Sequence, residues 1–446
     1  MRASVAAAAG AIALAGLTPQ IAAQGPLRYE RRDTFVGPDF FSRWTFLDGP
    51  DPTHGAVEYV AYGPAAAQGL VNATADRVFM GPIATAAAAN STGHRSVRIE
   101  SKASYNGGLF VVALDHIPTG CGTWPALWMY GEDPAHKWPS WGEFDLIEGT
   151  HRADRTTTTL HTGFGCDQSA VVPGRDFASQ WVLGSEGVPA DNCDVHAPDQ
   201  YWNQGCAQSG PPASMGVDFN RRGGGTFASE WDPTQGYFRT WFWPAGSVPE
   251  DLVRGAPEPI TWGQPYSFFR LSPENCPASH FQNMRLVVDV TLCGDLGTAS
   301  FEGACPELAS QVNCWDYVQG HPEIMAEAYW SIRMLDVYQL TEERPVINII
   351  DVLKRFRPGH LGNGIVARIA PVAAAALCGL AAAAVAAVAV VRRGVLLRRK
   401  PLSGDASRGL KEVEEQVVLY QPIPLQTSKV VVRDLAALEA GAAPAV

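Results

Sequence analysis

Three carboxylates stand close together in one short stretch of this sequence, Trp141-Gly-Glu-Phe-Asp-Leu-Ile-Glu-Gly149. In a β-strand the side chains alternate between the two faces, so Glu143 and Asp145 would project from the same face. Regular alternation would then bring Ile147 to that acidic face and send Glu148 to the opposite layer. Glu148 joins the other acids only if a β-bulge accommodates one extra residue, and bulges do occur beside active sites.

Two carboxyl groups on one face suit glycoside hydrolysis. A retaining glycosidase needs one ionised carboxylate to attack the anomeric carbon and one protonated carboxyl, about 5–5.5 Å away, to protonate the leaving oxygen. We assign Glu143 as the nucleophile and Glu148 as the general acid and then the general base. Asp145 would hydrogen-bond the nucleophile and help to separate the two glutamate pKa values. The alternative reading of the bare pattern is a solvated acidic edge without catalytic function.

Tryptophans surround the acidic stretch, in a chain that has 13 of them. Flat indoles suit the apolar faces of sugar rings, and polar groups meet the hydroxyls. Core packing accounts for some of these indoles. We expect Trp124, Trp128 and Trp141 to contact substrate, and Trp138 also flanks the acids.

The elements that must position these residues are predicted to be strands. Helical periodicity is scarce, whereas short apolar runs bounded by Gly, Pro, Asn or Asp are frequent. Many short strands with such turns predict an all-β fold, an antiparallel β-sandwich. The runs include Leu109–Leu114, Tyr237–Trp243, Leu286–Leu292 and Trp330–Tyr338.

The acidic stretch resembles the active-site strand of glycoside hydrolase family 16, in its bulge-containing, laminarinase-like branch, and more narrowly the fungal endo-1,3(4)-β-glucanases. The similarity covers about Tyr29 to Gln339 and keeps the order of the family's motifs. The other motifs that carry it are Gly120-Cys-Gly-Thr-Trp-Pro-Ala-Leu-Trp128, Gly223-Gly-Gly-Thr-Phe-Ala-Ser-Glu-Trp231, Trp241-Phe-Trp-Pro244, Cys293-Gly-Asp295 and Ala328-Tyr-Trp330.

This resemblance implies a concave β-jelly-roll with an open cleft, in which internal β-1,3 or mixed β-1,3/1,4 linkages of β-glucan are hydrolysed with retention. It implies the same roles for the three acids as the strand pattern does. His161 matches a histidine on the neighbouring strand that contacts the acid/base or the sugar. Glu230 and Trp231 match a pair that faces the cleft in relatives, and a structural salt bridge is the alternative for Glu230.

The two ends of the chain have the composition of targeting and membrane segments. Residues 1–24 read as a signal peptide, with Arg2 before a short apolar run and small residues at a cleavage zone. Residues 369–391 are uncharged and about as long as a membrane-spanning helix needs to be. The arginines that follow predict a cytoplasmic tail, residues 392–446, of disordered composition. The catalytic domain would then be residues 25–345, joined by a linker, residues 346–368, and it would be extracellular at the cell surface.

Charge and cysteine content exclude other classes of partner. The formal net charge of −11 disfavours nucleic acid, because no basic stripe is present to neutralise phosphates. Eight of the nine cysteines lie between the two apolar segments, which predicts disulfides, although the sequence does not indicate which cysteines pair. No zinc-type spacing occurs, and carboxylate chemistry requires no cofactor or metal. We expect a monomeric catalytic domain, and the sites Asn72 and Asn90 fit glycosylation.

Two other functions remain open. Transglycosylation shares the covalent intermediate with hydrolysis, so the acidic residues do not separate the two reactions. A catalytically silent glucan receptor is suggested by the membrane segment and the long tail. The presence of all three acids argues against the receptor, because binding alone needs none of them.

Overall fold

The computed structural model describes residues 28–83 and 93–341 of the chain. The predicted signal peptide, linker, membrane segment and tail lie outside these residues, as does Asn90, whereas Asn72 is exposed on a described strand. Among the helices within the described ranges, none has the length and apolarity needed to cross a membrane. The structure therefore bears on the expected catalytic domain and leaves the two ends of the chain as expectations.

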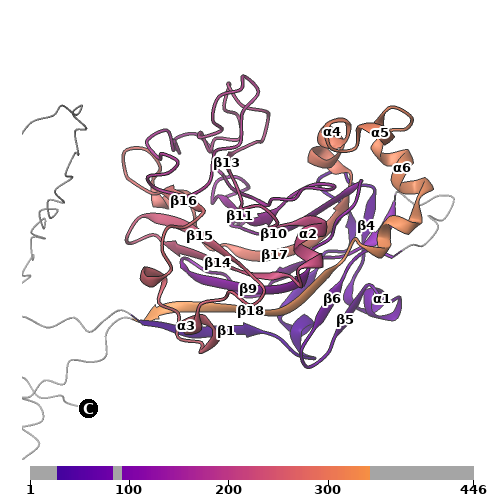
Figure 1. Ribbon diagram of the computed structural model, residues 1–446, viewed down its shortest axis with the longest axis horizontal. Coiled ribbons are helices and arrows are strands. Elements are labelled where there is room, and N and C mark those ends of the chain that lie inside the picture. The colour runs from indigo at the N-terminus through magenta and orange to yellow at the C-terminus, as the bar shows by residue number, and fades with distance from the viewer. Residues whose placement is uncertain (1–27, 84–92, 342–446) are drawn as a thin grey trace, which may run out of the picture. The chain divides into compact units, whose positions relative to one another are not determined.

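An eight-stranded antiparallel sheet forms one layer of the fold (Figure 1). The four apolar runs expected to be strands are all strands, and three of them lie here. The paired order in this sheet is β16 (Ser267–Arg270), β15 (Tyr237–Pro244), β14 (Gly225–Asp232), β9 (Gly108–His116), β18 (Trp330–Thr341), β6 (Val78–Met80) and β5 (Val71–Ala73), with β1 (Arg28–Phe35) paired to β18.

The second layer is a seven-stranded antiparallel sheet, and it contains the acidic strand. Its central strands are long, whereas the edge strands are short. The order is β13 (Cys206–Ser209), β12 (Thr157–His161), β11 (Glu143–Glu148), β10 (Thr123–Tyr130), β17 (Arg285–Leu292), β8 (Arg98–Ser101) and β2 (Trp44–Phe46).

The two sheets pack face to face over a shared apolar core, which confirms the antiparallel sandwich. On β10, Leu127 and Met129 are fully buried in this core, and Trp128 between them faces the other way. Phe144 on β11 meets Phe238 of the other sheet with ring centroids 4.7 Å apart. Strand alternation therefore gives the seven-stranded sheet one core face and one outer face.

Smaller elements complete the described part of the chain. A third sheet consists of β3 (Gly49–Pro50), β4 (Val57–Tyr59) and β7 (His94–Ser96), of which β4 and β7 are parallel. The α-helices are α1 (Tyr62–Ala67), α2 (Gly216–Arg221), α3 (Glu250–Val253), α4 (Gly294–Ala304), α5 (Pro306–Ala309) and α6 (Cys314–Gly320). The 3-10 helices are Phe40–Arg43, Pro259–Thr261, Ala278–His280 and Pro322–Ala326.

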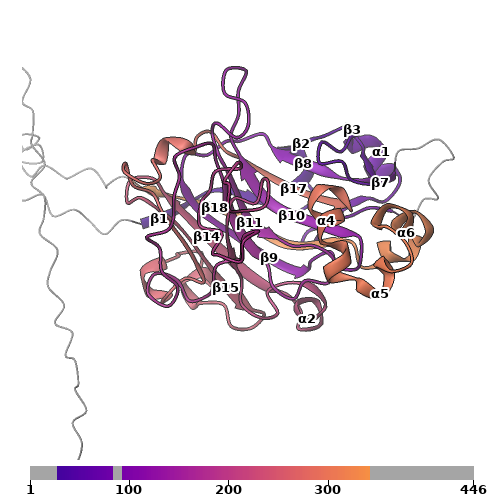
Figure 2. The same cartoon turned by 90° about the horizontal axis from the view of Figure 1, so that it is seen from above.

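Helices α4 to α6 and the loops around β13 rise above the same face of the seven-stranded sheet, at its two ends (Figure 1). Helix α4 packs against β10 (Figure 2). Four disulfides hold these flanks, and they confirm the expectation that the eight cysteines pair. Closing long loops with covalent links restricts the unfolded chain most. The bonds are Cys121–Cys305, Cys293–Cys314, Cys166–Cys276 and Cys193–Cys206.

Candidate active site

The acidic strand β11 carries the expected bulge. On the neighbouring strand β10, Leu127 lies opposite Ile147 but the next residue, Trp128, lies opposite Asp145, so Leu146 is the extra residue. Leu146 and Ile147 are both fully buried, although they are consecutive. The bulge therefore returns the residue that follows them to the outer face, as the strand pattern required.

All three acids face the same side of the sheet. Glu143 and Asp145 lie opposite Tyr130 and Trp128 of β10, and Glu148 lies opposite Ala126. Directly opposite residues of paired strands share a face, and these residues alternate with the buried core residues of β10. The structure thus brings the three predicted acids together on the outer face.

Each glutamate accepts a hydrogen bond from a different indole. Trp124 Nε1 donates to Glu148 Oε1 over 2.9 Å. Trp138 Nε1 donates to Glu143 Oε2 over 2.5 Å. An N–H donor stabilises the ionised form of the carboxylate that it contacts. Trp138 was named in the sequence only as a flanking tryptophan, and its contact with Glu143 had no signal there.

His161 lies directly opposite Glu143 on β12. Its Nε2 is 3.1 Å from Asp145 Oδ2, although the direction of the contact is not that of a hydrogen bond. His161 is thus close to Asp145, whereas its expected contact with the acid/base or the sugar stays a prediction. A positive charge on this ring would stabilise the ionised carboxylates around it.

Burial dominates the acid–base behaviour of the cluster. It raises the pKa of Glu143 to about 8, with the charge of Asp145 as the next cause, whereas His161 and the Trp138 hydrogen bond oppose the rise. Burial also raises the pKa of Glu148, and the Trp124 hydrogen bond opposes this. For Asp145, burial and then the charge of Glu148 raise the pKa. Burial therefore raises the pKa of all three carboxyl groups above their ordinary values.

One subset of these groups has the spacing of a cation site. Glu143, Asp145 and His161 each offer one ligand atom, and the three atoms lie within 4.8 Å of one another. Two carboxylates and an imidazole are ligands for several divalent ions. The same atoms are those that acid–base chemistry on this face would use.

Of the other predicted binding residues, the three tryptophans lie near the acids or next to β11, whereas Glu230 and Trp231 lie on the other sheet. Trp124 and Trp128 are half-buried on the outer face beside the acids, as expected. Trp141 precedes β11, and its ring stacks on His136 at a centroid distance of 4.3 Å.

Glu230 and Trp231 do not reach this face. They lie on β14 in the other sheet, where Trp231 is 1% exposed and stacks on Phe238 in the core between the sheets. Glu230 is buried and bonded to Tyr29 and Arg239. The expected contact with substrate is therefore wrong for both residues. Strand alternation sends one side chain inward and the other outward on the far sheet, and the structural salt bridge is the correct reading of Glu230.

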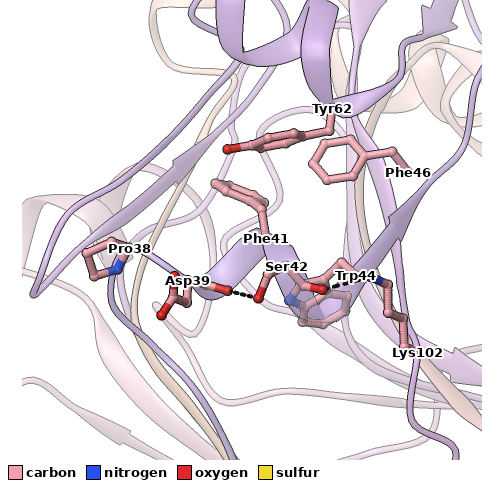
Figure 3. A pocket seen from close by; sticks show the side chains of 8 residues that line it. All are labelled: Pro38, Asp39, Phe41, Ser42, Trp44, Phe46, Tyr62 and Lys102. Carbon is pink, nitrogen blue, oxygen red and sulfur yellow. Dashed lines mark hydrogen bonds between the residues drawn. The ribbon is translucent and has the colours of Figure 1, made fainter.

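An aromatic hollow of about 360 Å³ lies away from the acids (Figure 3). Its wall includes Phe41, Trp44 and Phe46 near β2, with the ring of Tyr62 above them. Phe41 and Trp44 are buried and belong to the core. None of the carboxylates of β11 lines the hollow.

Known proteins are similar to most of this chain. The family model described as "XgeA-like, catalytic GH16 domain" matches residues 44–338, more than half of the chain. A probable glycosidase of Schizosaccharomyces pombe is 35% identical over 309 residues, which are 68% of this chain and 68% of that protein. An endo-1,3(4)-beta-glucanase of Arthroderma benhamiae is 35% identical over 326 residues, 72% of this chain and 66% of the relative. In an Aspergillus clavatus relative the match spans only 46% of that protein.

Solved structures share the fold at similar identity. Laminarinase 16A from Phanerochaete chrysosporium, solved with β-glucans in donor and acceptor sites, has a TM-score of 0.62 and 35% identity, covering 70% of this chain and 100% of that one. An elongating GH family 16 beta-1,3-glucosyltransferase has a TM-score of 0.60 and 31% identity over the same shares of the two chains.

Proposed function

Because the chain belongs to glycoside hydrolase family 16, as an XgeA-like catalytic domain, we propose that it is a retaining endo-glycosidase. Its substrate would be β-glucan, cut at internal β-1,3 or mixed β-1,3/1,4 linkages. The observation that carries this proposal is the bulge at Leu146, which leaves Glu143 and Glu148 on the same outer face. The name of the Arthroderma benhamiae relative, an endo-1,3(4)-beta-glucanase, supports the substrate class.

The proposed reaction has two displacements. The Glu143 carboxylate attacks the anomeric carbon, the glycosidic bond breaks, and Glu148 gives its proton to the leaving oxygen. A water molecule then attacks the same carbon, Glu148 takes a proton from it, and Glu143 leaves as a carboxylate. Burial raises the pKa of Glu148, which favours the protonated form that the first step needs. Burial and the charge of Asp145 raise the pKa of Glu143 to about 8, so the nucleophile becomes ionised as the pH rises toward that value; the Trp138 donor and His161 oppose the rise.

Replacing the nucleophile tests this proposal in the full chain. Glu143→Gln should lower hydrolysis of laminarin by at least about 10³-fold, because no covalent intermediate can form. Binding of laminarin to the variant should remain. Glu250→Gln, on the exposed start of α3, is the matched control and should hydrolyse like the wild type. Unchanged hydrolysis by Glu143→Gln would refute the assignment, and a wild type that binds but never cleaves glucan would favour the receptor.

Transglycosylation is the second candidate, supported by the similarity to the elongating glucosyltransferase. Another glucan chain would replace water in the second displacement. Incubation with laminari-oligosaccharides at high concentration separates the two by the share of products longer than the substrate, because a transglycosylase transfers most glycosyl units to another chain whereas a hydrolase transfers most of them to water. Digests of laminarin, lichenan and cellulose, read by product size, identify the preferred linkage.

We also propose that the enzyme acts outside the cell, anchored by residues 369–391. Four disulfides in the described residues support an oxidising compartment. An antibody to the catalytic domain should label intact cells, and one to the tail should label only permeabilised cells. The reverse labelling would exclude this orientation.

A further inference from the structure

A fourth acid faces the same side of the sheet as the three already described. Asp289 lies on β17 directly opposite Ala126 of β10, and Ala126 lies directly opposite Glu148 of β11. The two carboxylates therefore stand in one row across the sheet, separated by the small side chain of Ala126. Strands are about 4.8 Å apart, so their backbones are about 10 Å apart across this row.

Two indoles complete the surroundings of Ala126. Trp124 and Trp128 are two positions before and after it on β10, and so share its face. Trp124 Nε1 donates to Glu148, and Trp128 Nε1 donates to Asp289 Oδ2 over 3.0 Å. The result is a small floor with an aromatic ring on two sides and a carboxylate on the other two. Aromatic faces and acceptor oxygens are the groups that a sugar ring and its hydroxyls require.

Asp289 keeps one oxygen available in this arrangement. The residue is only 6% exposed. Its Oδ2 is occupied by Trp128, whereas Oδ1 has no hydrogen-bond partner among the described residues and is not sealed from solvent. Arg98 lies opposite Asp289 on β8, and its guanidinium bonds Glu100 and stacks on Trp128 at 4.8 Å. Burial raises the pKa of Asp289 to about 7, and the charge of Arg98 opposes this rise without a direct hydrogen bond. Buried polar atoms normally have a hydrogen-bond partner, so Oδ1 of this buried carboxyl group can accept a hydrogen bond from a bound ligand.

We propose that Asp289 positions substrate: its Oδ1 accepts a hydrogen bond from a hydroxyl of the glucosyl unit that lies over Ala126, between the indoles of Trp124 and Trp128. This inference rests on the proposed β-glucan substrate and adds a binding residue on the β17 side of the scissile bond. Asp289 takes no proton in the reaction, so its contribution is to binding and orientation.

Asp289→Asn in the full chain separates this role from a structural one. The amide retains an oxygen for Trp128 Nε1 but places NH₂ where Oδ1 was, so the acceptor for the sugar hydroxyl is lost. Affinity for laminarihexaose, measured by calorimetry in the Glu143→Gln background, should fall about tenfold. In the otherwise wild-type chain, KM should rise by a similar factor with little change in kcat. Asp232→Asn, an equally buried aspartate on the far sheet, is the matched control and should change neither value.

The outcomes separate this inference from the proposed function. If the wild type hydrolyses laminarin and Asp289→Asn binds laminarihexaose as tightly as its parent, Asp289 only supports Trp128 and the inference fails alone. If kcat falls while affinity is unchanged, substrate binding is also not its role. If laminarihexaose does not bind and no glucan is hydrolysed, both proposals fall. Trp128→Phe, which removes the donor and keeps the ring, should weaken binding less than Asp289→Asn does.

Discussion

Leu146 and Ile147 are consecutive residues of β11, and both side chains point into the core between the two sheets. Two consecutive inward side chains interrupt the regular alternation of side chains between the two faces of the strand. As a consequence, Glu148 is on the same face as Glu143 and Asp145, five and three positions earlier. Two carboxyl groups on one strand can then approach opposite sides of one glycosidic bond.

The bulge predicts the effect of truncating these two residues. Leu146→Ala and Ile147→Ala should each lower the free energy of unfolding by about 2–4 kcal/mol, because each leaves a cavity in the same core. Urea denaturation followed by tryptophan fluorescence gives both values. Leu183→Ala, at an exposed leucine, should cost far less. A strand with regular alternation would show a large loss at only one of the two positions.

The two glutamates should respond differently to azide. In Glu148→Ala, an aryl β-glucan oligosaccharide with a good leaving group still forms the intermediate, because its departure needs no acid. Azide should then restore turnover and give a β-glycosyl azide. In Glu143→Ala, azide attacks in place of the nucleophile and should give the α-anomer. Proton NMR of the products distinguishes the anomers, and the opposite pairing of variant and anomer would exchange the assigned roles.

Asp145 should set the acidic limb of the pH profile. Its negative charge is, after burial, the main cause that raises the pKa of Glu143 to about 8. In Asp145→Asn the ionised form of Glu143 becomes easier to reach, so its pKa falls. The nucleophile is active when ionised, and the acidic limb of kcat/KM should therefore move to lower pH by about one pH unit. Asp251→Asn, a buried aspartate on α3, should leave the limb in place. A limb that moves to higher pH in Asp145→Asn would contradict this account.

Local pattern predicted the acidic strand and made a bulge the condition for Glu148 to share the acidic face; the resemblance to the bulge-containing branch of the family turned that condition into an expectation. Polar and apolar residues alternate with period two from Glu143 to Leu146. The apolar pair Leu146 and Ile147 interrupts this alternation, and a β-bulge with one extra residue would accommodate it. The strands at Leu109–Leu114 and Leu286–Leu292 were predictable for the same reason, since short apolar runs bounded by turn residues are a local signal. The number of cysteines likewise predicted that they would pair, though not which partners they would take.

Only the tertiary structure decided which side chains meet. Glu230 and Trp231 match a family motif, but they belong to the far sheet, where one points outward and the other into the core. Asp289 has no local signal in its strand, and strand pairing places it beside Ala126 and Trp128. Contact between strands distant in the sequence depends on their order and register in the sheet, which no local periodicity encodes. The sequence alone therefore determined which residue types are available for chemistry, and folding determined which of them share a face.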